Sequence, residues 1–220
     1  MIRAVGFDLD NTLYDQEQHV FPFFADAARY LAEQTSLDPG ALEYGFRALW
    51  RKLGPSHPAL FDHALEQQGI RTRDRVRKLV NMYHSTVGVL ELYTGARELL
   101  ESLARRTKLF LITDGDAAMQ LRKIRSLGIA SFFAAAILTG AHGRGWRKPS
   151  TAPFLHAAKS LQVAPELCLY VGDNPACDFG GAAAIGMRTA RVLTGPFSAA
   201  EDSVRVDYTL RSLAELDALV

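Results

Sequence analysis

From residue 96 onward, the chain alternates between short apolar runs and segments whose apolar residues recur at helical spacing. The runs predict buried strands, and the segments between them predict amphipathic helices. Strands that alternate with helices run parallel, because each helix returns the chain to the edge where the next strand begins. We therefore expect a parallel sheet with helices on both faces. The predicted strands are 108–113, 134–139, 167–172, 189–193 and 206–210, and the predicted helices are 96–105, 116–127, 151–162 and 178–186.

Residues 15–90 break this alternation, because their apolar residues recur only at helical spacing, as Val20, Phe23 and Ala27 do. The sequence therefore predicts an α/β core of residues 1–14 and 91–220, interrupted by an all-helical domain of residues 15–90. The insertion departs directly after Asp8 and Asp10, which lie in the first run, 5–13. An insertion there could cover a site at the strand ends as a lid.

Composition excludes several classes of protein. The 220 residues are 48% hydrophobic and 22% charged, which suffices for a core and an inserted unit. A net charge of +1 gives no overall field for nucleic acid or membrane, and the apolar stretch 132–138 is far shorter than the ~20 residues of a membrane span. Because Asp8 and Asp10 come within the first ten residues, we expect no uninterrupted apolar segment of a secretion signal, and the two cysteines suit a reducing compartment. We expect a cytoplasmic monomer or homodimer with no nucleic-acid or membrane partner.

Polar residues follow the predicted strands at the ends where ligands gather in parallel sheets. In addition, a glycine-rich loop ends in a lysine. The residues are Asp8 and Asp10 in the first run, Thr113, Asp114 and Gly115 after the next, Lys148 after the loop, and Asp173 and Asp178 after 167–172.

These side chains match the requirements of phosphoryl transfer, which needs a nucleophile, a proton donor, a divalent cation and donors to the phosphoryl oxygens. Asp8 can attack phosphorus, and Asp10 can protonate the leaving alkoxide and later activate water. Mg²⁺ prefers oxygen ligands, so Asp8, Asp173 and the backbone carbonyl of Asp10 form a suitable set. Asp178 would orient these ligands.

Thr113 offers a hydroxyl to a phosphoryl oxygen, and Lys148 supplies the positive charge that the acids lack. Each residue also has an ordinary interpretation: Thr113 as a helix cap, Lys148 as a solvated loop residue, and the aspartates as turn or cap residues. Their joint occurrence at successive strand ends favours the catalytic interpretation.

On these residues the chain resembles the haloacid dehalogenase (HAD) superfamily, specifically its phosphatase branch with a small C1-type helical cap, over essentially its whole length. Asp8 and Asp10 match the family's Asp-x-Asp nucleophile and acid/base, and Thr113 matches its second-motif Ser/Thr. Lys148 matches the third-motif lysine, and Asp173 and Asp178 match Gly-Asp-x-x-x-x-Asp. The resemblance implies a Rossmann-like sheet with a cap that opens and closes, and Mg²⁺ bound by Asp8, Asp10, Asp173 and Asp178. Asp114 departs from the pattern, since many relatives carry Asn there.

The expected activity is hydrolysis of a small phosphorylated metabolite through an aspartyl-phosphate, because a cap that encloses the site argues against macromolecular substrates. We expect the substrate to contact Asp114 and Gly115 in the core and Tyr14, His19 and His57 on the cap side. Three alternatives stay open at this point: a phosphomutase, a 2-haloacid dehalogenase that uses the same Asp8, and a phosphate-binding module without turnover. Asp10 and Asp173 weigh against the dehalogenase, which needs neither an alkoxide proton nor a metal.

Overall fold

The computed structural model describes residues 1–55 and 57–220. They form two compact units, one of Met1–Gln16 with Val89–Val220 and the other of Glu17–Gly88. Within the described residues, no helix is both long and apolar enough to span a membrane.

The first unit contains a six-stranded parallel sheet with the order β3-β2-β1-β4-β5-β6. This confirms the predicted α/β, Rossmann-like fold class. The alternation of strands and helices decides the result, because each helix connects two strands of the same direction. The strands are β1 (Ala4–Phe7), β2 (Lys108–Thr113), β3 (Ala135–Leu138), β4 (Cys168–Gly172), β5 (Arg188–Val192) and β6 (Tyr208–Leu210).

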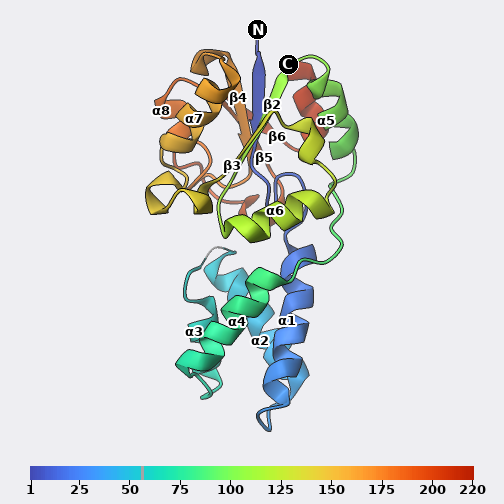
Figure 1. Cartoon of the computed structure of the whole chain (residues 1–220), viewed down its shortest axis with the longest axis vertical. Helices are drawn as coiled ribbons and strands as arrows, with labels where there is room; N and C mark the ends of the chain where they lie inside the picture. Colours follow the sequence, from blue (N-terminus) through green and yellow to red (C-terminus); the bar gives the residue numbers. More distant parts are fainter. Residues whose placement is uncertain (56) are drawn as a thin grey trace. The chain divides into compact units, whose positions relative to one another are not determined.

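Helices cover both faces of this sheet, with α7 and α8 on one side and α5 on the other (Figure 1). On the face of α7 and α8, Phe154 packs edge-on against Tyr170 of β4, whose ring lies near that of Phe110 of β2. Every residue of β1 and β4 is buried, as expected for central parallel strands that helices cover on both faces. The helices are α5 (Ala96–Ala104), α6 (Ala117–Ser126), α7 (Ala152–Leu161) and α8 (Gly180–Ala184).

The second unit is all-helical and has its own core. Its helices are α1 (Glu17–Ala32), α2 (Pro39–Leu53), α3 (Leu60–Gln67) and α4 (Arg73–Ser85). Asp38 begins α2 by accepting a hydrogen bond from the Ala41 amide at 2.7 Å, with Pro39 in the first turn. Inside the unit the rings of Phe24 and Phe46 stack with their centroids 5.5 Å apart.

The sheet register positions the polar residues of the first unit. Phe7 at the end of β1 pairs with Leu111 of β2 and with Val171 of β4. Since β1 lies between these two strands, the residues that follow all three emerge side by side at one edge of the sheet. This edge carries the candidate site.

Candidate active site

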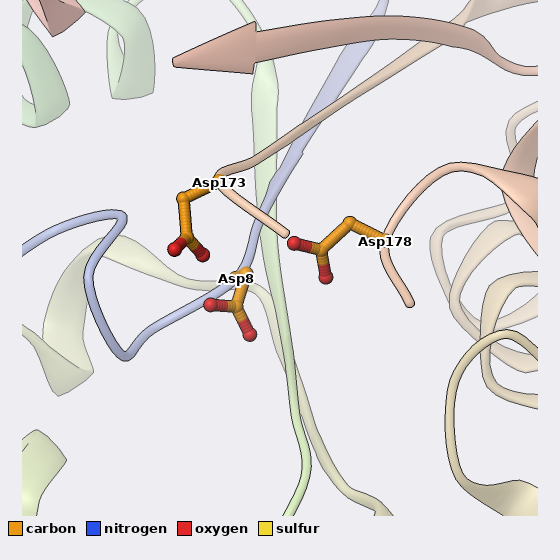
Figure 2. A group of neighbouring side chains, drawn as sticks. All are labelled: Asp8, Asp173 and Asp178. Atoms are coloured by element: carbon orange, nitrogen blue, oxygen red, sulfur yellow. The ribbon is translucent and has the colours of Figure 1, made fainter. Parts of the chain in front are cut away.

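Three carboxylates form the centre of the site. Asp8 follows β1, and Asp173 and Asp178 follow β4; Figure 2 shows their carboxylates gathered around one point. One ligand atom from each lies within 4.8 Å of the others, and all three side chains are buried. Among the described residues, no donor reaches the Asp173 Oδ2 atom. A buried carboxylate oxygen without a donor is unfavourable unless a cation binds it.

Lys148 partly neutralises these carboxylates. Its buried Nζ lies 2.5 Å from Asp8 Oδ1 and 2.6 Å from Asp178 Oδ1. Three carboxylates and one ammonium leave two negative charges when all are ionised. Burial raises the pKa of Asp8 to about 7, and the charge of Asp178 adds to this effect, although the Lys148 charge acts to lower the pKa. Burial and the charges of Asp178 and Asp8 also raise the pKa of Asp173.

One divalent cation would remove this charge imbalance. The ligand atoms are all carboxylate oxygens that lie close together, and Asp173 Oδ2 accepts no hydrogen bond from the described residues. These features fit a hard ion such as Mg²⁺. The hydroxyl of Thr12 lies 3.3 Å from Asp8 Oδ2 and 3.4 Å from Asp173 Oδ1, so it orients two of the three acids.

Asp10 lies in a different environment, and its carboxylate is not part of the three-acid group. Its Oδ1 accepts hydrogen bonds from Lys123 Nζ at 2.6 Å and from the Tyr14 hydroxyl, and its Oδ2 accepts one from Gln120 Nε2 at 2.8 Å. Burial alone raises the pKa of Asp10, but the Lys123 charge and these three hydrogen bonds lower it below its usual value. Two neighbouring aspartates with oppositely shifted pKa values are typical of acid/base sites.

Thr113 ends β2 and is buried beside Asp10, with its Oγ1 accepting a hydrogen bond from Gln120 Nε2 at 2.5 Å. The chain then turns through Gly115, whose φ of 119° favours glycine, and enters α6 at its N-cap Asp116. Asp114 accepts hydrogen bonds from Thr139 Oγ1 at 2.6 Å and from the Lys148 amide at 3.3 Å. The Asp114 side chain, at the position where the sequence departs from the family pattern, therefore connects the loop of Thr113 to the loop of Lys148.

A sequence model described as haloacid dehalogenase-like hydrolase matches residues 2–186. The chain belongs to this family.

Two relatives and one solved structure illustrate the similarity. The "Glyceraldehyde 3-phosphate phosphatase" of Methanocaldococcus jannaschii is 32% identical to this HAD-like chain, over 100% of this chain and 97% of its own length. The "Phosphoglycolate phosphatase" of Chromobacterium violaceum is 30% identical over 98% of this chain and 95% of its own. The crystal structure of a 2-haloacid dehalogenase from Pseudomonas syringae superimposes with a TM-score of 0.66 at 29% identity, covering 100% of this chain and 98% of that one.

The predicted cap-side contacts of this HAD hydrolase have ordinary environments within their own units. Tyr14 is buried, and its hydroxyl donates to Asp10. His19 is buried in the helical unit, with its ring 5.0 Å from that of Tyr83. The Nδ1 atom of His57 accepts a hydrogen bond from the Ala59 amide at 3.3 Å. Substrate contact by these three side chains stays a prediction, as does a contribution of Asp10 to the metal through its backbone carbonyl.

Sequence reasoning missed the Asp10 partners Lys123 and Gln120, as well as Thr12 and Tyr170. A signal for the first two was present: Gln120, Lys123, Ile124 and Leu127 follow the spacing i, i+3, i+4 and i+7 of a buried helix face. Two polar residues in such a stripe indicate a buried polar partner. Tyr170 gives no such signal, because its strand position reads as core; its hydroxyl accepts from Lys148 Nζ at 3.4 Å and donates to the Ile112 carbonyl at 3.1 Å.

Proposed function

We propose that this HAD hydrolase is a Mg²⁺-dependent phosphatase that hydrolyses a small phosphorylated metabolite through an aspartyl-phosphate on Asp8. The observation that carries the proposal is that two aspartates close together in the chain have different surroundings. Asp8 lies among carboxylates with the Lys148 ammonium, and Asp10 lies among three hydrogen-bond donors. A nucleophile and an acid/base need this difference in environment.

In the first step, a carboxylate oxygen of Asp8 forms a bond to phosphorus while the bond from phosphorus to the ester oxygen breaks. Asp10 transfers its proton to the departing oxygen, which leaves as an alcohol. The lowered pKa of Asp10 favours its carboxylate form, which is the form that the second step needs as a base. Thr113 and the Lys148 ammonium bind phosphoryl oxygens.

In the second step, Asp10 acts as a base. Its carboxylate takes a proton from water, the water oxygen attacks phosphorus, and the bond between Asp8 and phosphorus breaks. Asp8, Asp173 and Asp178 would hold the Mg²⁺, with the Asp10 carbonyl as a further ligand. The bound ion supplies positive charge that offsets the repulsion between the nucleophile and the phosphate.

Relatives support a small substrate, because the two described above carry the names of phosphatases for glyceraldehyde 3-phosphate and phosphoglycolate. We further propose that residues 15–90 act as a cap that selects the substrate. In support, the helical unit Glu17–Gly88 is inserted into the chain shortly after the loop that contains Asp8 and Asp10. A cytoplasmic location is part of the proposal, since the two cysteines, Cys168 and Cys177, are both free thiols.

The decisive variant is Asp8→Asn. An amide of similar shape cannot attack phosphorus, so phosphate release should fall by roughly 10³-fold or more. A panel of phosphorylated metabolites with Mg²⁺, which includes both substrates named above, measures the loss, and circular dichroism checks the fold. Substantial hydrolysis by Asp8→Asn would reject Asp8 as the nucleophile.

Metal removal tests the cation separately. Excess EDTA should abolish turnover, and added Mg²⁺ should restore it, because the three acids otherwise repel both each other and the phosphate. Product analysis on the same panel tests the alternatives: phosphate returned to the substrate identifies a mutase, and halide released from 2-haloacids identifies a dehalogenase. Full activity in EDTA would contradict the metal assignment.

A further inference from the structure

Three buried side chains form hydrogen bonds with the Asp10 carboxylate. Lys123, Tyr14 and Gln120 all donate to it, and all three donors are buried. The Asp10 side chain nevertheless keeps 20% of its surface exposed. The donors therefore hold both carboxylate oxygens in place while part of the side chain stays accessible.

Stability alone is a weak explanation for Lys123. Its side chain is only 1% exposed, so its charge is removed from water almost entirely. The desolvation penalty of such a pair offsets much of the Coulombic gain, and an apolar pair of similar volume is often equally stable. The clearest physical effect of this ion pair is to fix where the Asp10 oxygens lie.

Gln120 connects Asp10 to Thr113, the predicted ligand of a phosphoryl oxygen. Its Nε2 amide group donates both to Asp10 Oδ2 at 2.8 Å and to Thr113 Oγ1 at 2.5 Å. Residues 120 and 123 lie on one face of α6, as positions i and i+3 of a helix do. The helix begins directly after the loop that follows Thr113, so one rigid element determines the positions of the predicted phosphate ligand and of the predicted acid/base.

We propose that Lys123 is a positioning residue for proton transfer, which together with Gln120 aims the accessible part of Asp10 at the leaving oxygen of a phosphate ester bound at Thr113. The inference rests on the proposed function, in which the Asp10 O–H bond breaks as the O–H bond of the product alcohol forms. Lys123 itself touches neither the ester nor the nucleophile. Its effect should therefore depend on whether the leaving group needs a proton.

The test compares two leaving groups in the variant Lys123→Met, which keeps the side-chain volume and removes the charge. For the best alkyl phosphate of the metabolite panel, kcat/KM should fall by about 100-fold, because an alkoxide must be protonated as it leaves. For p-nitrophenyl phosphate, whose anion is a stable leaving group, kcat/KM should fall by less than about fivefold. Since kcat/KM reports only steps up to release of the first product, the second step does not affect the comparison.

Two backgrounds separate positioning from folding. In Asp10→Asn, the additional change Lys123→Met should alter kcat/KM for the alkyl phosphate by less than about twofold, because the group that Lys123 positions is already lost. This double variant also leaves no unpaired buried charge if Lys123→Met alone folds poorly. Lys123→Arg should recover part of the alkyl activity, and Arg125→Met, at an exposed position of the same helix, is the matched control with wild-type values for both substrates.

The outcomes are distinguishable. A selective loss for the alkyl phosphate that disappears in Asp10→Asn supports the inference. Equal losses for both substrates, or an undiminished loss in Asp10→Asn, would overturn it while the proposed function stands. A wild-type protein that hydrolyses no phosphate ester overturns the proposed function and the inference together.

Discussion

At the scale of single residues, the site separates two carboxylates that lie only two positions apart in the chain. Asp8 is placed among other acids, and its pKa rises mainly because it is buried. Asp10 keeps 20% of its side chain exposed, and the charge of Lys123 together with the hydrogen bonds from Lys123, Tyr14 and Gln120 outweighs the effect of its burial on the pKa. The difference comes from partners supplied by other elements, since the two side chains are chemically identical.

The raised pKa of Asp8 predicts how metal affinity depends on pH. Mg²⁺ binds the ionised carboxylate, so a proton with a pKa of about 7 competes with the ion. For one such group, Mg²⁺ affinity should increase about tenfold between pH 6 and pH 8. Titration calorimetry over this range measures the change, and an affinity independent of pH would contradict the assignment of Asp8 as a ligand.

The same shift predicts the stability of the metal-free protein. The folded state binds the Asp8 proton more tightly than the unfolded state, whose pKa is near the ordinary 3.8. The free energy of unfolding should therefore decrease as pH rises from about 4 to about 7 through this group. In Asp8→Asn this contribution is absent, so urea denaturation of the two proteins in EDTA should show a shallower pH dependence for the variant.

At the scale of elements, the close fit of β4 against the turn that follows it positions Asp178. A Cβ atom added at Gly172 would lie 2.4 Å from Asp178 Oδ2, which also accepts a hydrogen bond from the Asn174 amide at 2.9 Å. Only glycine leaves room for that carboxylate. The end of a strand thus determines the position of a side chain six residues later.

Gly172→Ala should therefore displace Asp178 and weaken Mg²⁺ binding by about 10- to 100-fold, the usual effect of disturbing groups that orient metal ligands. Calorimetry measures the affinity. Gly145→Ala is the matched control, because a Cβ there meets no atom within 4 Å. Unchanged Mg²⁺ affinity in Gly172→Ala would show that Asp178 does not help to hold the ion.

At the scale of the whole molecule, the chain folds into two units with separate hydrophobic cores. The proposed metal ligands all belong to Met1–Gln16 and Val89–Val220. Damage to the core of Glu17–Gly88 should therefore change the stability of that unit without changing the ligands.

Leu31→Ala tests this independence. Leu31 is fully buried in the helical unit, and its truncation should cost about 2–5 kcal/mol of that unit's stability. The fluorescence of Trp50, which is buried in the same core, should report earlier unfolding in urea. Mg²⁺ affinity measured without urea should stay within about twofold of the wild-type value. A large loss of affinity would mean that the two units fold as one.

The sequence by itself determined the order of strands and helices, the parallel sheet and the chain positions of the polar residues. These follow from the periodicity of apolar residues and from the rule that parallel strands end at one edge, both of which depend on local chain geometry. For this reason Asp8, Thr113, Lys148, Asp173 and Asp178 could be named before any coordinates were known.

Only the tertiary structure decided which groups those residues meet. Asp10 is paired with Lys123, more than a hundred positions away, because α6 packs with that face toward the end of β1. The orientation of a helix about its axis depends on the packing of the whole unit, and no local pattern specifies the partner of a polar side chain. The same holds for Thr12 between two acids and for Tyr170 under Lys148. Strand order places the side chains at one edge, but the packing of the unit determines their partners, their distances and so their pKa values.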